Sequence, residues 1–188
     1  MQKRKMTFRE LAIDHTWTLF LDRDGVINAH IEGVYVTSLL DFKLLPGAAE
    51  AIAGLSQRFG RIIVVTNQQA VGKGLLSEEE LGWMHDHVQS EVNKHGGKVD
   101  LFLYAAELQS EGGNRRKPGT GMAMEAQQRF PEIDFSRSVI VGDSPSDMLF
   151  GQRLCMKTVF IQNPWKTFEG ADFTFSSLSD FYYQLSEV

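Results

Sequence analysis

The sequence has little cysteine, no long apolar run and no excess of positive charge among its 188 residues. With one cysteine, Cys155, neither an internal disulfide nor a zinc site built from several cysteines can form. We expect this lone cysteine to be a buried thiol, as free cysteines usually are. The longest apolar strings, such as Ile62–Val65, are far shorter than the ~18 residues that span a bilayer, and no such string follows the basic residues 1–5. We therefore expect a cytoplasmic protein without a membrane partner.

The charge balance limits the partners that the protein can attract. There are 24 acidic and 19 basic residues, which give a net charge of −5 without a long basic stripe, and this disfavours a nucleic-acid partner. An anionic substrate would need a local cluster of cations or a metal ion. The length and a hydrophobic content of 43% suit one globular domain with its own core. We expect a monomer in which 1–188 form a single domain, with 1–15 as an N-terminal extension.

Short apolar runs alternate with longer amphipathic stretches, a pattern typical of a parallel sheet with crossover helices. We predict strands at 17–21, 61–65, 100–104, 138–141 and 157–161, and helices at 46–59, 77–95, 119–130, 144–154 and 176–185. Ser77 and Glu80 form a capping-box pattern at the start of one helix. The expected fold class is α/β, a three-layer Rossmann-like parallel sheet with helices on both faces. No large cap domain fits between the strands, so any lid must be small and built from 28–37 and 107–116.

Polar groups occur at four places where a predicted strand, or the loop after it, ends. They are Asp22-Arg23-Asp24-Gly25, Thr66-Asn67-Gln68-Gln69, Arg115-Arg116-Lys117 and Gly142-Asp143-Ser144-Pro145-Ser146-Asp147. Taken alone, each has an ordinary explanation as a turn, a strand-end hydrogen-bonding pair, a solvated basic patch or a helix cap. In a parallel sheet, however, the carboxyl ends of the strands meet at one edge, where ligands bind. The convergence of all four therefore indicates one functional site.

The residue types at this edge suit phosphoryl transfer. The carboxylate of Asp22 can attack phosphorus, which splits one difficult displacement into two easier ones. Asp22 and Asp143 offer the hard oxygen ligands that Mg²⁺ prefers, and Lys117 and Thr66 can hold oxygens of the transferring group. Asp24 can protonate the leaving oxygen and then deprotonate the attacking water. We predict a magnesium-dependent phosphatase that acts on a small phosphorylated metabolite.

The same residues resemble the four motifs of the haloacid dehalogenase superfamily, over about 18–179. The similarity is to a subgroup that contains the D-glycero-D-manno-heptose 1,7-bisphosphate phosphatases and the histidinol phosphatase domain. The segments that carry it are Phe20–Asn28, Val65–Gln69, Arg116–Pro118, Gly121–Met122 and Val141–Asp143. Members of this subgroup are small and nearly capless, which agrees with the short connections seen here.

The resemblance implies a role for each matching residue. Asp22 would be the nucleophile and Asp24 the general acid and base. Thr66 and Lys117 would stabilise the transferring phosphoryl group. Mg²⁺ would be bound by Asp22, by the backbone carbonyl of Asp24 and by Asp143.

Other positions would serve the substrate or support the centre. The resemblance implies that Arg116 contacts substrate, as do Asn67 and Gln68 through the loop that they begin. Asp147 would support the catalytic lysine or the metal without binding substrate. His30 is a further substrate-contact candidate, because it lies in the loop after the nucleophile.

Three departures from the subgroup pattern bear on the substrate. Many members bind zinc through cysteines and a histidine in the loop that here is Ala105–Arg116, which contains neither residue type, so we expect no structural zinc. Ser144 stands where the heptose enzymes carry a lysine, and 29–35 is slightly longer than the matching loop. The expected substrate is a D-glycero-D-manno-heptose 1,7-bisphosphate, hydrolysed at its 7-phosphate. Histidinol phosphate, another sugar phosphate or a nucleotide is the alternative.

Two readings from other classes compete with a phosphatase. A dehalogenase would use the aspartate on carbon, but it needs neither metal nor Asp24. A receiver-like signalling domain also combines aspartate, threonine, lysine and Mg²⁺, but its phosphorylated aspartate normally follows a later strand, and Asp24 would shorten the life of the signal.

His85 and His87 lie two apart on a predicted helix and do not share a face, so we expect both to be exposed.

Overall fold

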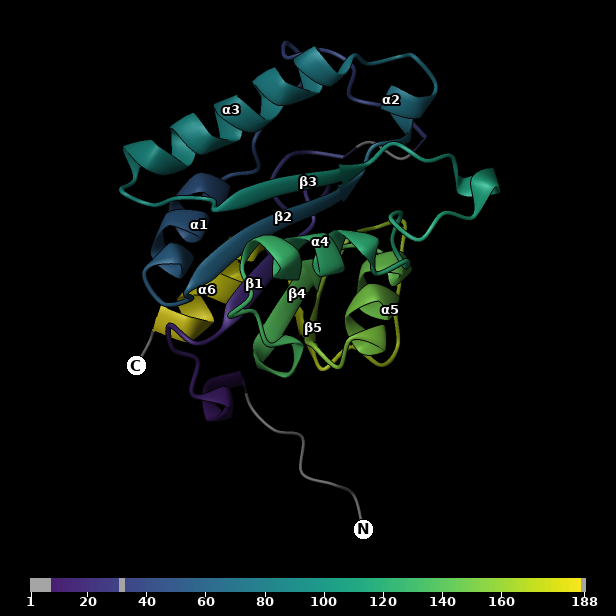
Figure 1. Cartoon of the computed structure of the whole chain (residues 1–188). Coiled ribbons are helices and arrows are strands. Elements are labelled where there is room, and N and C mark those ends of the chain that lie inside the picture. Colours follow the sequence, from purple (N-terminus) through teal and green to yellow (C-terminus); the bar gives the residue numbers. More distant parts are fainter. Residues whose placement is uncertain (1–7, 31–32, 187–188) are drawn as a thin grey trace.

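The computed structural model describes residues 8–30 and 33–186, which fold around a six-stranded parallel sheet (Figure 1). In chain order the strands are β1 (Thr18–Leu21), β2 (Arg61–Asn67), β3 (Leu101–Ala105), β4 (Ser138–Gly142), β5 (Lys157–Ile161) and β6 (Phe173–Phe175). They stand in the order β3-β2-β1-β4-β5-β6, and every neighbouring pair is parallel. The predicted parallel sheet is thus confirmed, and β6 is an edge strand too short for the sequence pattern to reveal.

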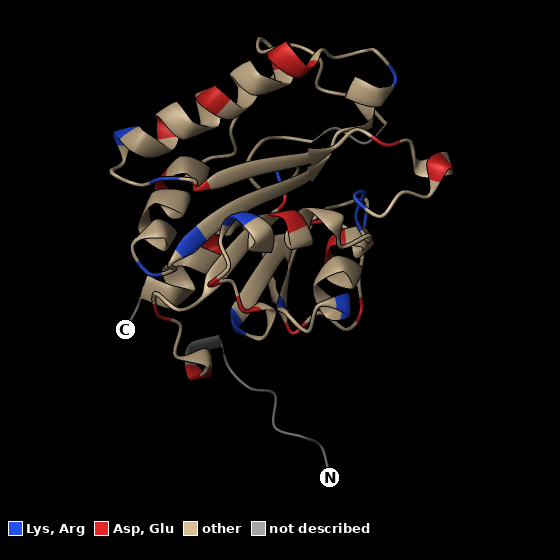
Figure 2. Cartoon of the chain, in the orientation of Figure 1, with Lys and Arg blue, Asp and Glu red and all other residues tan. Residues whose placement is uncertain are grey.

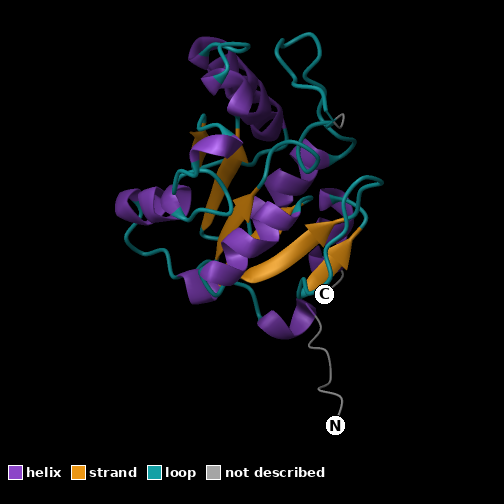
Figure 3. Ribbon diagram, turned by 90° about the vertical axis from the view of Figure 1, so that its right-hand side faces the viewer, coloured by secondary structure: helices purple, strands orange, loops and turns teal. Residues whose placement is uncertain are grey.

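Helices cover both faces of this sheet, which confirms the predicted three layers (Figure 3). They are α1 (Ala48–Ser56), α2 (Gln69–Gly72), α3 (Glu78–Lys94), α4 (Gly121–Arg129), α5 (Pro145–Arg153) and α6 (Leu178–Ser186), with 3-10 turns η1 (Phe8–Leu11), η2 (Gln109–Glu111) and η3 (Phe135–Arg137). Helices α1, α3 and α6 pack on one face, and α4 and α5 pack on the other. The capping box predicted for Ser77 and Glu80 opens α3.

The alternation of side chains along each strand explains the two core layers. Leu19 and Leu21 belong to the apolar cluster beneath α1, α3 and α6, while Phe20 between them belongs to the cluster beneath α4 and α5. Because both faces are covered, the central strands are apolar at consecutive positions, as in Ile62–Val65. The sequence therefore shows short apolar runs where a sheet open to water would show alternation.

The chain reverses direction in the sheet next to β1. At the end of β1, Leu21 pairs with Val64 of β2 on one side and with Val141 of β4 on the other. The chain builds outward from β1 through β2 to β3, and then returns to add β4, β5 and β6 on the opposite side. Such a reversal opens a crevice at the carboxyl ends of the two central strands. The segments that follow β1, β2 and β4 therefore meet at one place.

The prediction that Cys155 is buried is wrong, because this residue is exposed. It follows Leu154, the C-cap of α5, and adopts a left-handed conformation with φ of 57°. Its N–H donates to the carbonyl of Gln152, and the N–H of Met156 donates to that of Gly151. This is the Schellman arrangement that ends a helix. The apolar neighbours in the sequence gave no sign of it.

The prediction that His85 is exposed is also wrong. Its exposed fraction is 9%, and its ring stacks on Phe102 with centroids 4.7 Å apart. On α3 the buried residues are Leu81, Met84, His85, Val88 and Val92, which recur at helical spacing. His85 belongs to this apolar stripe, and its separation from His87 does not bear on burial.

Part of the predicted N-terminal extension and part of the predicted lid loop, residues 1–7 and 31–32, lie outside the described residues. From residue 8 the extension forms η1, and Leu11 and Ile13 pack against the core. None of the helices in the described ranges is long and apolar enough to cross a membrane.

Candidate active site

A pocket of about 900 Å³ opens at the carboxyl ends of β1, β2 and β4. All four polar groups that the sequence predicts to converge contribute residues to its lining. The loop after β1 and the loop between β3 and α4 form its walls. In Figure 2 the basic segment of the second loop lies beside the carboxyl ends of the central strands. The expected convergence is therefore present in the fold.

Asp22 and Lys117 are in direct contact at the centre of this site. Lys117 Nζ lies 2.8 Å from Asp22 Oδ1 and donates a 2.7 Å hydrogen bond to the carbonyl of Val65. Asp22 Oδ1 also accepts a 2.7 Å hydrogen bond from the backbone N–H of Arg23. Among the described residues, none donates a hydrogen bond to the other oxygen, Oδ2. One carboxylate oxygen is thus held in place while the other is left for a reacting group.

Three carboxylates lie close together beside this ammonium group, and two of them, Asp22 and Asp147, contact it. Ligand oxygens of Asp22, Asp143 and Asp147 lie within 4.8 Å of one another. Burial first, and then the charge of Asp147, raise the pKa of Asp22 well above its ordinary value and that of Asp143 to about 6. Burial would lower the pKa of Lys117, but Asp147 and Asp22 outweigh it and raise this pKa to about 12. The lysine is therefore charged, and negative charge remains in excess.

The donor set fits a magnesium ion. Both oxygens of Asp147 are engaged, because Oδ1 lies 2.5 Å from Lys117 Nζ and Oδ2 accepts hydrogen bonds from the hydroxyl and N–H of Ser144 at 2.5 and 3.1 Å. Asp22 and Asp143 remain as hard oxygen ligands, and Mg²⁺ favours few protein ligands completed by water and phosphate. A divalent cation between them would offset the excess negative charge.

Gly25 allows the two metal-ligand candidates to approach each other. Its φ is +85°, and a Cβ at this position would lie 2.2 Å from Asp143 Oδ2. Any other residue would have to displace the carboxylate of Asp143 and would also be strained at this φ. The glycine after Asp24 is therefore required by the close contact between the segments that follow β1 and β4.

Asp24 is held by a network of donors. Its carboxylate accepts hydrogen bonds from Arg23 at 2.8 to 3.2 Å, from Asn28 at 2.9 Å and from Gln68 at 2.7 Å. Burial would raise the pKa of Asp24, but the charge of Arg23 and these hydrogen bonds outweigh it and lower the pKa. Arg23 is itself buried, with its guanidinium 5.3 Å from the centre of the Phe42 ring. In this arrangement Asp24 is a carboxylate.

The residues after β2 contact the catalytic candidates. Gln68 Nε2 donates both to Asp24 and to Thr66 Oγ1, the latter at 2.8 Å. Asn67 pairs with the backbone of Lys117, since its Oδ1 accepts from the lysine N–H at 2.9 Å and its Nδ2 donates to the lysine carbonyl at 3.1 Å. Both residues line the pocket, and their amides are hydrogen-bonded to the neighbouring catalytic candidates.

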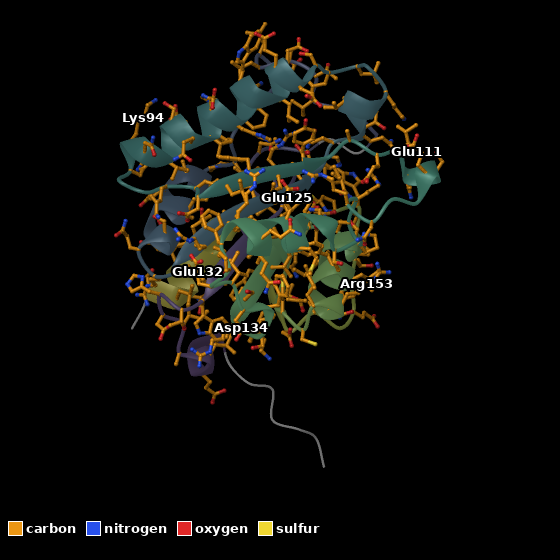
Figure 4. All side chains as sticks on the ribbon, viewed as in Figure 1. Lys94, Glu111, Glu125, Glu132, Asp134 and Arg153 are labelled. Atoms are coloured by element: carbon orange, nitrogen blue, oxygen red, sulfur yellow. The ribbon has the colours of Figure 1, made fainter. Side chains whose placement is uncertain are left out.

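The two remaining substrate-contact candidates come from the two different loops that wall the pocket. Arg116 and His30 both line the pocket and are half-buried. Arg153 of α5 and Lys166, which the sequence reading did not single out, line it as well. Arg153 is labelled on α5 in Figure 4. These side chains come from four separate segments, so no single motif in the sequence could have revealed the cluster.

Asn163 is a third residue that the sequence motifs did not identify. Its Nδ2 donates to the backbone carbonyl of Asp143 at 2.7 Å and approaches Oδ2 of the same residue at 3.3 Å. Its Oδ1 accepts from the N–H groups of Trp165 and Lys166. This side chain therefore joins the β5–β6 loop to a metal-ligand candidate and holds Lys166 Nζ 3.9 Å from Asp143 Oδ1.

The sequence profile of the haloacid dehalogenase-like hydrolases matches residues 3–152. The chain belongs to this family. The resemblance seen in the sequence motifs is thereby confirmed, and both the fold and the convergence of the motifs at the strand ends agree with it.

Relatives of the chain include heptose bisphosphate phosphatases. The chain is 41% identical over 134 residues to a D-glycero-alpha-D-manno-heptose-1,7-bisphosphate 7-phosphatase of Mycobacterium bovis, which covers 71% of this chain and 70% of that protein. It is 34% identical over 136 residues to a D-glycero-beta-D-manno-heptose-1,7-bisphosphate 7-phosphatase of Rhodopseudomonas palustris, covering 69% and 74%. A crystal structure of D,D-heptose 1,7-bisphosphate phosphatase from B. bronchiseptica, complexed with magnesium and phosphate, superimposes with a TM-score of 0.82 at 26% identity, covering 91% and 98%.

Family membership and these relatives decide between the classes of function that the sequence left open. The chain is a phosphatase of the haloacid dehalogenase-like family. The non-enzymatic receiver reading and the dehalogenase reading are both rejected.

Proposed function

We propose that this phosphatase hydrolyses the 7-phosphate of a D-glycero-D-manno-heptose 1,7-bisphosphate, with Asp22 as the nucleophile and Mg²⁺ as the cofactor. The observation that carries the proposal is the contact of Lys117 with Asp22 and Asp147 beside Asp143, in a chain 33–41% identical to curated heptose bisphosphate phosphatases.

In the first step, an oxygen of Asp22 attacks phosphorus and the bond from phosphorus to the sugar oxygen breaks. The oxygen that accepts no hydrogen bond from the described residues, Oδ2, is the one suited to attack. Lys117 and the hydroxyl of Thr66 stabilise the equatorial oxygens of the transferring group. Mg²⁺ at Asp22 and Asp143 would supply positive charge that offsets repulsion between the carboxylate and the phosphate.

Asp24 moves the protons in both steps. It gives a proton to the sugar oxygen as that oxygen leaves, and it later takes one from the water that attacks the aspartyl phosphate, which regenerates Asp22 and releases phosphate. Its donors Arg23, Asn28 and Gln68 favour the carboxylate, which suits the second step. To carry a proton in the first step, Asp24 must withdraw from Arg23, and the arrival of an anionic phosphate next to Asp24 favours that change.

The pocket suits a substrate with a second anionic group. Arg116, His30, Arg153 and Lys166 line it in addition to Lys117. A phosphate monoester occupies only the end beside Asp22, so the outer cations would be left to a second phosphate on the same sugar. Relatives named for the alpha and for the beta anomer both match the chain, and either anomer fits this reasoning.

The test is phosphate release from a panel, measured with Mg²⁺ and again with EDTA, with Asp22→Asn as the blank. The panel holds both anomers of heptose 1,7-bisphosphate, histidinol phosphate, a sugar monophosphate and a nucleoside monophosphate. We expect Mg²⁺-dependent release with a preference for one heptose anomer. Equal, weak release from every compound would reject the heptose substrate, and release that persists in EDTA would reject the magnesium role.

A further inference from the structure

A single side chain joins the two loops that form the walls of the pocket. Gln69 Nε2 donates a 2.7 Å hydrogen bond to the hydroxyl of Tyr35, in the loop after β1. Gln69 Oε1 accepts a 2.8 Å hydrogen bond from the backbone N–H of Gln109, in the loop after β3. All three residues line the pocket. We call this set of contacts the clasp.

The short helix α2 holds the clasp in place. Gln69 begins α2 and Lys73 follows it by four residues, so both side chains lie on one face of the helix. Lys73 Nζ donates to the same Tyr35 hydroxyl at 3.0 Å and lies 5.1 Å from the centre of its ring. On another side, a Cβ at Gly72 would lie 2.1 Å from the carbonyl oxygen of Ala106, so α2 packs closely against the start of the second loop.

The loop that the clasp holds also carries one cation of the pocket, Arg116. Beyond Gln109, the 3-10 turn η2 is closed by Glu111, whose carboxylate accepts from the N–H of Leu108 at 2.9 Å (Figure 4 labels Glu111 at the tip of this loop). The same loop positions Arg116, since Nη1 lies 3.4 Å from the carbonyl oxygen of Glu107. The loop 105–116 contains neither cysteine nor histidine, so a zinc ion bound by these residue types cannot fix its conformation. Hydrogen bonds such as these take that role.

We propose that Gln69 is a specificity-determining residue, which fixes the space for the non-reacting part of the substrate by joining the loops that carry Tyr35 and Gln109. The inference rests on the proposed function, because it assumes a substrate larger than the phosphoryl group. Gln69 takes no part in the reaction at Asp22. The rate of hydrolysis of a small ester that does not contact the pocket walls should therefore not depend on the clasp.

The test compares a large and a small substrate in Gln69→Met, which keeps the length of the side chain and removes both hydrogen bonds. For heptose 1,7-bisphosphate we expect kcat/KM to fall roughly tenfold, mainly through KM, since two hydrogen bonds are lost. For phenyl phosphate we expect a change of less than about twofold. The matched control is Gln57→Met, an exposed glutamine that donates to the carbonyl of Gly96 outside the pocket. It should leave both substrates unchanged.

A double-mutant cycle separates the clasp from independent effects. Tyr35→Phe should lower kcat/KM for the bisphosphate less than Gln69→Met does, and the double variant should fall no further than Gln69→Met alone, within about twofold. Equal losses for the two substrates, or strictly additive losses in the cycle, would overturn the proposal.

A readout without substrate keeps this inference distinct from the proposed function. If the wild-type protein did not hydrolyse either heptose anomer, the proposed function would be rejected, and the clasp would be judged by hydrogen exchange. The N–H of Gln109 is protected by Gln69 Oε1, so Gln69→Met should speed exchange in 105–116 several-fold, whereas Gln57→Met should not. Unchanged exchange in Gln69→Met would show that the loops are not joined in solution, and the inference would fall.

Discussion

Replacing the nucleophile candidate by its neutral isostere should abolish turnover and at the same time stabilise the metal-free protein. In Asp22→Asn the shape of the side chain is kept, while one of three crowded carboxylates loses its charge. The raised pKa of Asp22 means that its charged form is disfavoured in the folded state, first by burial and then by Asp147. Lys117 keeps its contacts with Asp147 and with the carbonyl of Val65, so the variant leaves no buried ion without a partner.

The size of the effect follows from what the change removes and what it leaves. Single stabilising substitutions commonly add about 0.5–2 kcal/mol of unfolding free energy, and we expect about 1–2 kcal/mol here because repulsion between buried carboxylates is removed. In a chain of this length that corresponds to a rise of roughly 2–8 °C in the unfolding temperature. Adding Mg²⁺ should stabilise the wild type more than the variant, because a side-chain amide is a poorer ligand than the carboxylate of Asp22 and a ligand stabilises only the form that binds it.

The assay is urea or thermal unfolding in EDTA and then in Mg²⁺, alongside turnover of the preferred substrate. Asp86→Asn, on the exposed side of α3, is the matched control for the loss of one carboxylate, and it should change stability by less than about 0.5 kcal/mol. Activity above a few per cent of wild type would reject Asp22 as the nucleophile. A variant less stable than wild type in EDTA would reject the electrostatic reasoning, whatever its activity.

Four further substitutions test other parts of the structure. Asp24→Asn should slow turnover roughly 10²-fold or more on a substrate with a poor leaving group, and wild-type rates would remove Asp24 from proton transfer. Gly25→Ala should lower Mg²⁺-dependent activity at least about tenfold by displacing the adjacent metal ligand, whereas Gly74→Ala, with a similar φ of +68° and nothing within 4 Å, should only cost stability. Burial lowers the pKa of His85 from 6.5 to about 4, so the contribution of the neutral ring to the unfolding free energy is intact above about pH 6.5 and is lost as pH falls toward 4. His85→Leu removes this pH dependence. In urea unfolding, the stability of His85→Leu relative to wild type should therefore rise by about 2 kcal/mol between about pH 7.5 and pH 5. Cys155→Gly should raise the unfolding free energy by about 1 kcal/mol, because its left-handed φ of 57° suits glycine, and a loss of stability would contradict this account of the helix end.

Local signals in the sequence predicted the fold and the centre of the site. The segment Ile62–Val65 is apolar at every position because both faces of the sheet are covered. The capping box of Ser77 and Glu80 marks the start of a helix through local hydrogen bonds. Asp22 and Asp143 were predictable because each directly follows a strand, and parallel strands bring their carboxyl ends together whatever the intervening length. These inferences need only the order of elements along the chain.

Contacts between distant segments were not predictable in the same way. Gln69 meets Gln109, and Asn163 meets Asp143, through loops whose path depends on their whole surroundings. His85 was misjudged because its burial depends on the stripe of α3 as a whole. Strand β6 has three residues, too few for periodicity to distinguish from a loop. In each case the deciding information lies in tertiary packing and not in a motif.

The charge arrangement suggests a role for Asp147, the acidic residue that contacts Lys117 beside Asp22. A buried lysine without partners would have its pKa lowered by burial, and here Asp147 and Asp22 together raise it. In the proposed mechanism, however, the carboxylate of Asp22 becomes a mixed anhydride with phosphate in the aspartyl phosphate and contributes no charge of its own. Asp147, 0% exposed and held by Ser144, then remains beside Lys117. Under the proposed mechanism, this position would allow Lys117 to stay protonated through both steps, so that the ammonium group would be available to the phosphoryl oxygens when the intermediate is hydrolysed.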